Sequence, residues 1–392
     1  MTGPIRIAFI VTVPVTAKVL LRGQLADLRI HGFDVTVISS PGPELDVVRE
    51  REGVRVIGIP IARETDALAD ARALAALTRE LRALAPDIVN ASTAKAGLLG
   101  MIAARTARVP SRIYLLRGLR LETERGAKRA VLGITERIAA ACAHRVVAVS
   151  DSLRERYVAD GYAPAHKCSV LGAGSSNGVE IARFARTPAR ITEAATVRAG
   201  LGIAPTAPVI GFVGRPVRDK GMAELLDAFE VVTATRPDAR LVIIGSGFAD
   251  DAVDPAISAR LAARRDVVMV PRVEEPAPYY AMMDVLAFPS HREGFPNVPL
   301  EAAAAGVPTV GSRATGVRDA VADGVTGLLF DTGDARGLAA GLGRYLDDPA
   351  LRSAHGAEAA RRATEKFSRE AVWSAWRELY TGLAQLPPNS GI

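Results

Sequence analysis

Residues 209–232 read VIGFVGRPVRDKGMAELLDAFEVV and predict a strand, a glycine-flanked turn and a helix in direct succession. The strand candidate is apolar along its whole length, as parallel strands buried on both faces are. A turn between such a strand and a helix presents free backbone N–H groups to an anion. Arg215 and Lys220 add two positive charges, which suits a diphosphate held without a metal. The alternative is that both are surface cations in a loop.

The same alternation of apolar strands and helices fills the rest of the chain. Helical spacing of apolar residues predicts helices at 66–84 and 126–143, among others. Strands are predicted at 5–11, 35–39, 54–59, 87–92, 113–116 and 146–150, and again at 209–214, 241–245, 267–270, 285–290, 307–312 and 327–330. Strands of this kind separated by helices indicate doubly wound parallel sheets.

We therefore predict an α/β protein with two Rossmann-like domains, and we expect the active site in the cleft between them. Residues 187–207 lack a strand and are rich in Ala, Thr, Pro and Gly, which is typical of a linker. The expected domains are 1–190 and 208–366, joined by a linker at 191–207. Residues 367–392 would form a C-terminal helix that can pack back on the first domain.

The composition of the 392-residue chain, with 49% hydrophobic and 23% charged residues, is ordinary for a soluble globular enzyme. The early apolar stretch contains Arg6 and predicts a buried strand rather than a signal peptide. Cys142 and Cys168 are the two cysteines, with no CxxC motif, which favours a reducing compartment. We expect a cytoplasmic protein.

The net charge of +6 is unevenly distributed. Residues 105–145 alone carry ten basic and three acidic side chains, a net charge of +7. Such a patch attracts polyanions. It contains one aromatic residue, Tyr114, and no nucleic-acid-binding motif, so an anionic membrane surface or a phosphate-bearing acceptor fits better than nucleic acid. The alternative is a solvated arginine-rich face.

Residues 291–309, HREGFPNVPLEAAAAGVPT, contain two carboxylates in apolar surroundings and no lysine between them. Glu293 lies in a loop at the carboxyl end of a predicted strand, where ligands of α/β sheets bind. Pro299 predicts the first turn of a short helix, so Glu301 would lie in that turn and interact favourably with the helix dipole. Together the two carboxylates could accept hydrogen bonds from sugar hydroxyls while helix N–H groups hold phosphate. A sugar nucleotide offers both kinds of group.

Several other sites are not indicated by the sequence. There is no D-x-D motif, and the five histidines form neither HxH nor HExxH, so we expect no metal. The segments GSGFAD (245–250) and GAGSSNG (172–178) do not complete GxGxxG. They predict tight turns rather than a dinucleotide site.

The segments GRPVRDKG, YYAMMDVLAFPS, EGFPNVPLE, AAAGVPTVGS and GVRDAVADGVTGLLF together resemble the retaining family-4 glycosyltransferases. The resemblance implies a GT-B fold whose first domain takes the acceptor and whose second takes a nucleotide sugar. It implies that Glu293 faces the transferred sugar as the catalytic residue and that Glu301 bonds the ribose. The implied donor site is completed by Gly214, Arg215 and Lys220 at the diphosphate, by Gly294, Phe295, Pro296, Asn297 and Val298 along sugar and phosphate, and by Arg272 and Val273 near the base.

The first half is similar to a subgroup that builds capsule, O-antigen and related glycans on undecaprenyl-diphosphate carriers. The similarity is carried by NASTAKAGLLG, RGLRLET (117–123) and LGAGSSNGV (171–179). It implies acceptor-side roles for Asn90, Ser92, Lys95 and Arg117. Asn90 and Ser92 stand where many members have His-x-His.

The implied activity is metal-independent, retaining transfer of a hexose or N-acetylhexosamine from a UDP-sugar to a lipid-linked glycan, on a peripheral membrane protein. The nucleotide sugar is a co-substrate, and no cofactor is expected. One alternative keeps the transfer but uses a small soluble natural-product acceptor. A second is an isomerase like UDP-N-acetylglucosamine 2-epimerase, which shares the two-domain fold. A third is a lectin-like module without catalysis.

Overall fold

The computed structural model describes residues 3–62, 66–245 and 255–385, and the chain divides into two compact units. The first unit contains the described residues up to Asn177 together with those from Arg369 on. The second is the continuous segment Gly178–Ser368. The second unit is therefore inserted into the sequence of the first.

The first unit is built on a seven-stranded parallel sheet with the strand order β3-β2-β1-β4-β5-β6-β7. The strands are β1 (Arg6–Ile10), β2 (Asp34–Ser39), β3 (Arg55–Gly58), β4 (Ile88–Ser92), β5 (Ser111–Leu116), β6 (Arg145–Ala148) and β7 (Cys168–Val170). β1 and β4 are buried along almost their whole length, since helices cover both faces. In the central pairing, Phe9 of β1 lies opposite Asn90 of β4.

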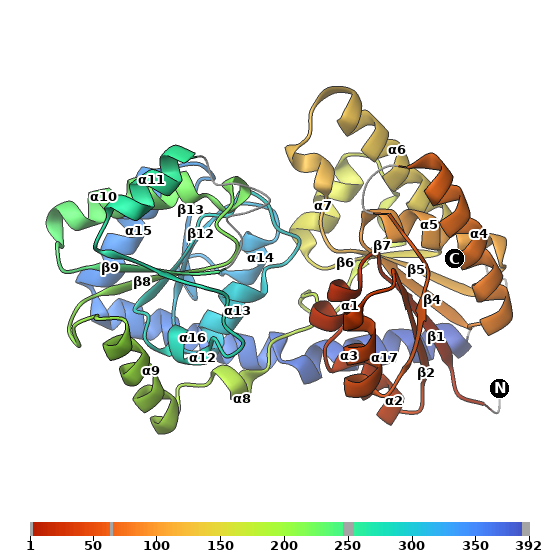
Figure 1. Ribbon diagram of the computed structural model, residues 1–392, viewed down its shortest axis with the longest axis horizontal. Helices are drawn as coiled ribbons and strands as arrows, with labels where there is room; N and C mark the ends of the chain where they lie inside the picture. The colour runs from red at the N-terminus through yellow and green to blue at the C-terminus, as the bar shows by residue number, and fades with distance from the viewer. Residues whose placement is uncertain (1–2, 63–65, 246–254, 386–392) are drawn as a thin grey trace. The chain divides into compact units, whose positions relative to one another are not determined.

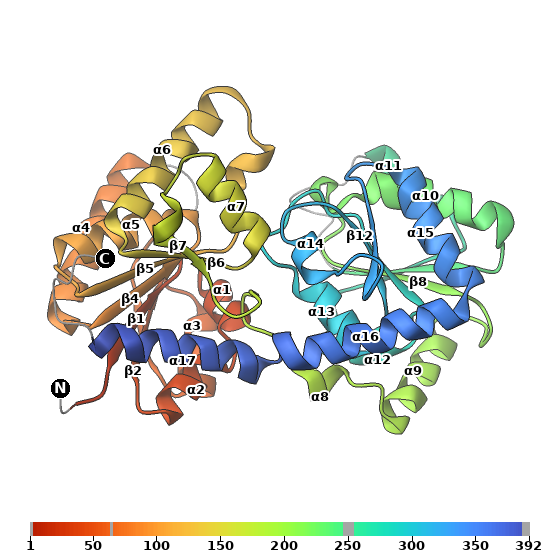
Figure 2. The ribbon, with the colours of Figure 1, turned by 180° about the vertical axis from the view of Figure 1, so that it is seen from behind.

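Helices cover both faces of this sheet (Figures 1 and 2). The first unit contains α1 (Pro14–Leu20), α2 (Gln24–Ile30), α3 (Pro43–Glu52), α4 (Ala67–Leu84), α5 (Ala94–Thr106), α6 (Gly126–Cys142), α7 (Asp151–Ala159) and α17 (Arg369–Gln385), with short 3₁₀ turns η1 (Arg120–Thr123) and η2 (Ala165–Lys167). One face carries α1, α2, α3 and α17, and the other carries α4, α5 and α6 (Figure 2). α17 thus completes a layer whose other helices come from the start of the chain.

The second unit has a six-stranded parallel sheet in the order β10-β9-β8-β11-β12-β13. Its strands are β8 (Val209–Val213), β9 (Arg240–Ile244), β10 (Val267–Val270), β11 (Val285–Phe288), β12 (Thr309–Ser312) and β13 (Gly327–Phe330). Its helices are α8 (Ile181–Phe184), α9 (Pro188–Gly200), α10 (Met222–Thr235), α11 (Pro255–Ala263), α12 (Ala277–Ala281), α13 (Asn297–Ala304), α14 (Val317–Ala320), α15 (Ala335–Asp347) and α16 (Pro349–Phe367), with the 3₁₀ turn η3 (Arg218–Lys220). α10, α11 and α15 lie on one face and α12, α13 and α16 on the other (Figure 1).

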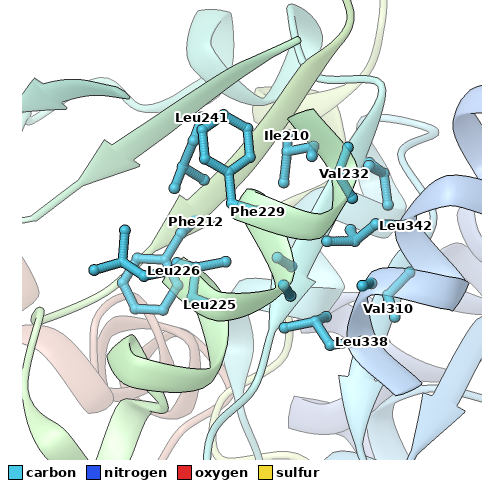
Figure 3. Close-up of a cluster of buried hydrophobic side chains, with 14 of the residues drawn as sticks. Ile210, Phe212, Leu225, Leu226, Phe229, Val232, Leu241, Val310, Leu338 and Leu342 are labelled. Carbon is cyan, nitrogen blue, oxygen red and sulfur yellow. The ribbon is translucent and has the colours of Figure 1, made fainter. Parts of the chain in front are cut away.

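An apolar cluster between the sheet and α10 and α15 forms the core of the second unit (Figure 3). Phe229 of α10 is fully buried there together with Phe212 and Leu241 from the strands. Removing a buried phenylalanine ring costs about 3 to 5 kcal/mol in such a core. This packing fixes β8 and α10, and hence the turn that joins them.

The structure confirms the predicted fold class and the twelve predicted strands. The prediction omitted β7, a three-residue strand at the edge of the first sheet. In the 172–178 segment, Gly172 and Gly174 have positive φ, as the predicted tight turn requires. The segment 245–250 lies outside the described residues from residue 246 on.

The expected linker at 191–207 differs from the structure. Residues 188–200 form α9, which packs against α12 inside the second unit, and the units divide at Asn177 and Gly178. Thr187 caps α9 by accepting a hydrogen bond from the backbone N–H of Arg190, and Pro188 occupies the first turn. The alanines that suggested a linker are strong helix formers.

None of the described helices combines the length and the apolar character needed to cross a membrane.

Candidate active site

The predicted donor residues gather at the centre of the second sheet. β8 and β11 are neighbours, and from them the chain winds outward in opposite directions, through β9 and β10 and through β12 and β13. Ligands of α/β sheets bind at the carboxyl ends of strands where the winding reverses in this way. The loop from Gly214 to Gly221 follows β8, and the loop from Pro289 to Pro296 follows β11.

These loops pack with backbone against backbone. Gly221 has φ +71°, and a Cβ atom there would lie 2.2 Å from the carbonyl oxygen of Pro289. A Cβ atom on Gly316 would lie 2.3 Å from the carbonyl oxygen of Gly294. Glycine is therefore required at both positions, and the close approach brings together side chains of three separate loops.

Lys220 and Glu293 form an ion pair between their Nζ and Oε1 atoms. They lie 73 positions apart in the sequence, and both side chains are largely buried. Ser290 Oγ lies 2.9 Å from the same carboxylate oxygen and can donate a hydrogen bond to it. No lysine lies near Glu293 in the sequence, but the fold brings Lys220 to its carboxylate. The pair therefore places a carboxylate and an ammonium together at the switch point of the second sheet, that is, at the carboxyl ends of β8 and β11 where the winding reverses.

Three further contacts hold the loop after β11 against the loop after β8 and the start of α10. The backbone N–H of His291 donates to the carbonyl of Asp219 at 2.9 Å, and its Nε2 lies 2.9 Å from Glu224 Oε1. Arg292 Nη2 donates to Asp219 Oδ2 at 3.2 Å. Glu224 belongs to the first turn of α10, so the loop after β11 is tied to the start of that helix.

The interpretation of Glu301 as a first-turn carboxylate is wrong. α13 begins at Asn297, two residues before Pro299, so Glu301 lies beyond the first turn. Its Oε2 accepts a hydrogen bond of 2.6 Å from the hydroxyl of Tyr280. Burial, reinforced by the Glu301 charge, raises the pKa of Tyr280 well above its usual value, so the tyrosine remains a donor. Glu301 is therefore an oriented acceptor rather than a helix-dipole partner.

The remaining donor candidates lie at the same carboxyl edge, but not all are buried. Arg215 is exposed on the loop after β8, and Arg272 is exposed after β10, beside the half-buried Val273. Phe295 is buried against Phe367, with ring centroids 5.2 Å apart. Asn297 Oδ1 is buried and has no hydrogen-bond partner among the described residues. No interaction in the structure joins Arg272 or Val273 to the Lys220–Glu293 pair within the described ranges.

The first unit has its own switch point between β1 and β4. Thr93, directly after β4, has φ +75°, a conformation that threonine rarely adopts. Its hydroxyl lies 2.6 Å from the hydroxyl of Thr12, which also accepts a hydrogen bond from the N–H of Ala96. Strained residues of this kind concentrate at functional sites.

The acceptor-side candidates lie at this edge. Asn90 is buried, and its Nδ2 donates to the hydroxyl of Tyr380 at 2.7 Å, whereas its Oδ1 has no partner among the described residues. Ser92 is buried two positions further along β4. Lys95 forms an ion pair with Asp70 at 2.8 Å.

Arg117 follows β5, and all three of its guanidinium nitrogens are buried without a hydrogen-bond partner in the described part of the chain. Burial lowers the pKa of Arg117 to about 10, against a smaller opposing effect of Tyr380. Arg117 is therefore still a cation at neutral pH. A buried charge without a counter-ion is costly, and an anionic group beside it would offset that cost.

The described residues contain no group of three His, Cys, Asp or Glu side chains arranged to hold a metal ion.

Comparison with known proteins identifies the family. Residues 207–348 match the family of glycosyl transferases group 1, and residues 17–174 match the glycosyl transferase 4-like domain. The capsular polysaccharide biosynthesis glycosyltransferase CapM of Staphylococcus aureus is 35% identical over 361 residues, which cover 92% of this chain and 93% of CapM. The chain belongs to the group 1 glycosyltransferases.

One further relative resembles this glycosyltransferase in sequence, and two solved structures resemble it in fold. An Escherichia coli UDP-Gal:alpha-D-GlcNAc-diphosphoundecaprenol alpha-1,3-galactosyltransferase is 27% identical over 324 residues, 81% of each chain. Anabaena HepE in complex with UDP and glucose superposes with a TM-score of 0.79 at 20% identity, over 96% of this chain and all of HepE. Sucrose-phosphate synthase from Thermosynechococcus elongatus gives a TM-score of 0.79 at 19% identity, over 97% and 99% of the two chains. The solved structures confirm the predicted GT-B fold. The family and the sequence relatives confirm the predicted hexosyltransferase activity.

Sequence reasoning missed the groups that orient the two glutamates. Ser290 is the last residue of the predicted strand 285–290 and lies three positions before Glu293, so its contact with that carboxylate could have been predicted from the sequence. Tyr280 lies in α12, 21 positions before Glu301, and only the packing of α12 on α13 brings the two together.

Proposed function

We propose that this glycosyltransferase moves a hexose or N-acetylhexosamine from a UDP-sugar to a lipid-linked glycan, with retention of anomeric configuration and without a metal ion. The observation that carries the proposal is the Lys220–Glu293 pair, formed by two loops at the switch point of the second sheet. The relatives support it, since the Escherichia coli enzyme takes UDP-galactose and a diphosphoundecaprenol acceptor and HepE binds UDP. The reaction would occur in the cytoplasm, at the inner face of the membrane.

On the donor side, cations would take the diphosphate. Lys220 would share its ammonium between Glu293 and the phosphates, and Arg215 and the backbone at Gly214 would complete that contact. Glu301, oriented by Tyr280, would accept hydrogen bonds from the ribose hydroxyls. The remaining contacts are proposed for the backbone of residues 294–298 along the sugar and for residues 272 and 273 at the base.

In the reaction, the bond between the sugar anomeric carbon and the β-phosphate oxygen breaks. The acceptor oxygen forms its bond to that carbon on the same face, and the acceptor proton passes to the departing phosphate oxygen. Lys220 and Arg215 stabilise the negative charge of the leaving UDP. The Glu293 carboxylate bonds the sugar and offsets the positive charge that develops at the ring.

On the acceptor side, we propose that Arg117 pairs with an anionic group of the acceptor. Its guanidinium is a buried cation without a partner in the described structure, and a lipid-linked diphosphate would supply the charge. Asn90 Oδ1 offers an acceptor for a hydroxyl at the same edge. Ser92 and Lys95 complete the proposed set.

The proposal is tested by measuring UDP release from a panel of UDP- and GDP-hexoses, with undecaprenyl-diphosphate glycans as acceptors. We expect acceptor-dependent release from one UDP-sugar, in the presence of a chelator, and a product with the donor's anomeric configuration by NMR. Thermal stabilisation by UDP but not GDP would support the nucleotide assignment.

The proposal would be contradicted by turnover with soluble acceptors alone, by inversion, or by conversion of the donor without acceptor. The last is the isomerase outcome, which membership of a transferase family already disfavours. Dependence of the rate on an added divalent cation would contradict metal independence.

A further inference from the structure

Helix α6 of the first unit exposes an apolar stripe. Val131, Ile134 and Ile138 are 58%, 54% and 40% exposed, and their spacing of three and four residues places them on one face. The exposed Ala127 and Ala141 extend the same face by one turn at each end. A surface helix normally directs its apolar stripe at the core, so an outward stripe calls for a partner.

The stripe is not a core face turned outward by loose packing. The other side of α6 is buried at Gly133, Ala139 and Ala140, and α6 packs on α5. Glu136, on the buried side, accepts hydrogen bonds from two buried tyrosines. The orientation of the helix is therefore fixed, and the stripe faces outward in the folded unit.

Cations border the stripe. Arg125, Lys128 and Arg137 are exposed on the same helix or directly before it. Lys128 pairs with Glu124 at 2.7 Å, while Arg137 donates to a backbone carbonyl and lies over the ring of Tyr162. The surrounding segment 105–145 carries a net charge of +7.

We propose that this face of α6 docks on the surface of an anionic lipid bilayer. An apolar stripe bordered by Lys and Arg is the pattern of a helix lying in the membrane interface, where the stripe enters the headgroup region and the cations meet lipid phosphates. A second copy of the chain fits worse, because two-fold pairing of this face would bring its cations together. The inference rests on the proposed function in one respect, that a lipid-linked acceptor lies in a bilayer.

The test uses the full chain with vesicles of phosphatidylcholine, alone or mixed with phosphatidylglycerol, in a flotation assay. We expect binding to the mixed vesicles at low salt, which weakens as salt is added. Ile134→Glu should lower the partition coefficient by roughly tenfold or more, because an apolar contact is replaced by a charge of the lipid's own sign. The matched control is Val231→Glu on α10, where the native side chain is 55% exposed. It should bind like the native protein.

A second variant tests the docking without relying on the correct folding of Ile134→Glu. Ile134→Trp keeps the face apolar, and its fluorescence should be quenched by brominated lipid in the mixed vesicles. Binding unaffected by Ile134→Glu, no flotation of the native chain at low salt, or a dimer that Ile134→Glu dissolves would each overturn the proposal. Transfer to a detergent-dispersed acceptor is measured in parallel. Docking without any transfer would refute only the proposed function. Transfer without docking would refute only the proposal that the α6 face binds the bilayer.

Discussion

Glu136 gives the sharpest prediction for stability, because its carboxylate is buried in α6. The hydroxyls of Tyr114 and Tyr157 donate to its Oε2 at 2.9 and 3.2 Å. Burial nevertheless raises the pKa of Glu136 from 4.5 to about 7, against the opposing effect of both hydrogen bonds. Between those values the folded protein holds a proton that the unfolded chain has lost. The free energy of unfolding therefore falls as the pH rises through that interval.

The perturbation is Glu136→Gln, which keeps the side-chain shape and removes the titration. Each unit of pKa shift corresponds to about 1.4 kcal/mol, so the full penalty on the native protein is about 3 kcal/mol at high pH. Part of this penalty is already present at pH 5, because the unfolded chain has begun to lose its proton at that pH. The stability of the variant relative to that of the native protein should therefore rise by roughly 2 to 3 kcal/mol between about pH 5 and about pH 8. Any constant cost of the amide cancels in this difference.

The assay is urea unfolding followed by tryptophan fluorescence. Both tryptophans, Trp373 and Trp376, lie in α17, so the signal reports on the first unit. Glu50→Gln, at an exposed position of the same unit, is the control and should show no such change with pH. A stability difference for Glu136→Gln that stays constant from pH 5 to pH 8 would refute the reasoning.

Three further predictions concern the second unit. Glu293→Gln should lower kcat about 100-fold or more and change the donor KM little, as steady-state kinetics would show; equal turnover would remove Glu293 from catalysis. Tyr280→Phe should lower the unfolding free energy by about 1 kcal/mol and raise the donor KM, because Glu301 loses a donor; unchanged values contradict this. Gly221→Ala should destabilise the unit, by circular dichroism in urea, more than Gly202→Ala, which has a similar φ and open space; equal losses would exclude a clash.

The sequence reveals the sheets well because buried parallel strands are continuous apolar runs. β11 is buried at every residue, and its run stands out without any knowledge of its neighbours. β7 has three residues, of which only Cys168 is buried. Its strand geometry depends on pairing with β6 at the sheet edge, and no local pattern encodes that pairing.

The site is less visible for a similar reason. Glu293 and Lys220 can be picked out separately, but their pairing requires β8 and β11 to be neighbours, a property of strand order. The start of α13 was misplaced because proline is tolerated anywhere in a first turn, where its missing N–H has no intrahelical partner. Pro299 therefore indicates that a helix starts nearby, but it does not indicate the residue at which the helix starts.

The position of α17 in the chain has a consequence for synthesis on the ribosome. Asn90 and Tyr380, hydrogen-bonded in the finished protein, are separated by 290 residues. At about 5 to 20 residues per second, that interval lasts roughly 15 to 60 s. The continuous second unit can fold on the nascent chain during this time, while the face of the first sheet that α17 will cover stays open. Chaperones that act during translation should therefore bind that face, during the interval before α17 emerges.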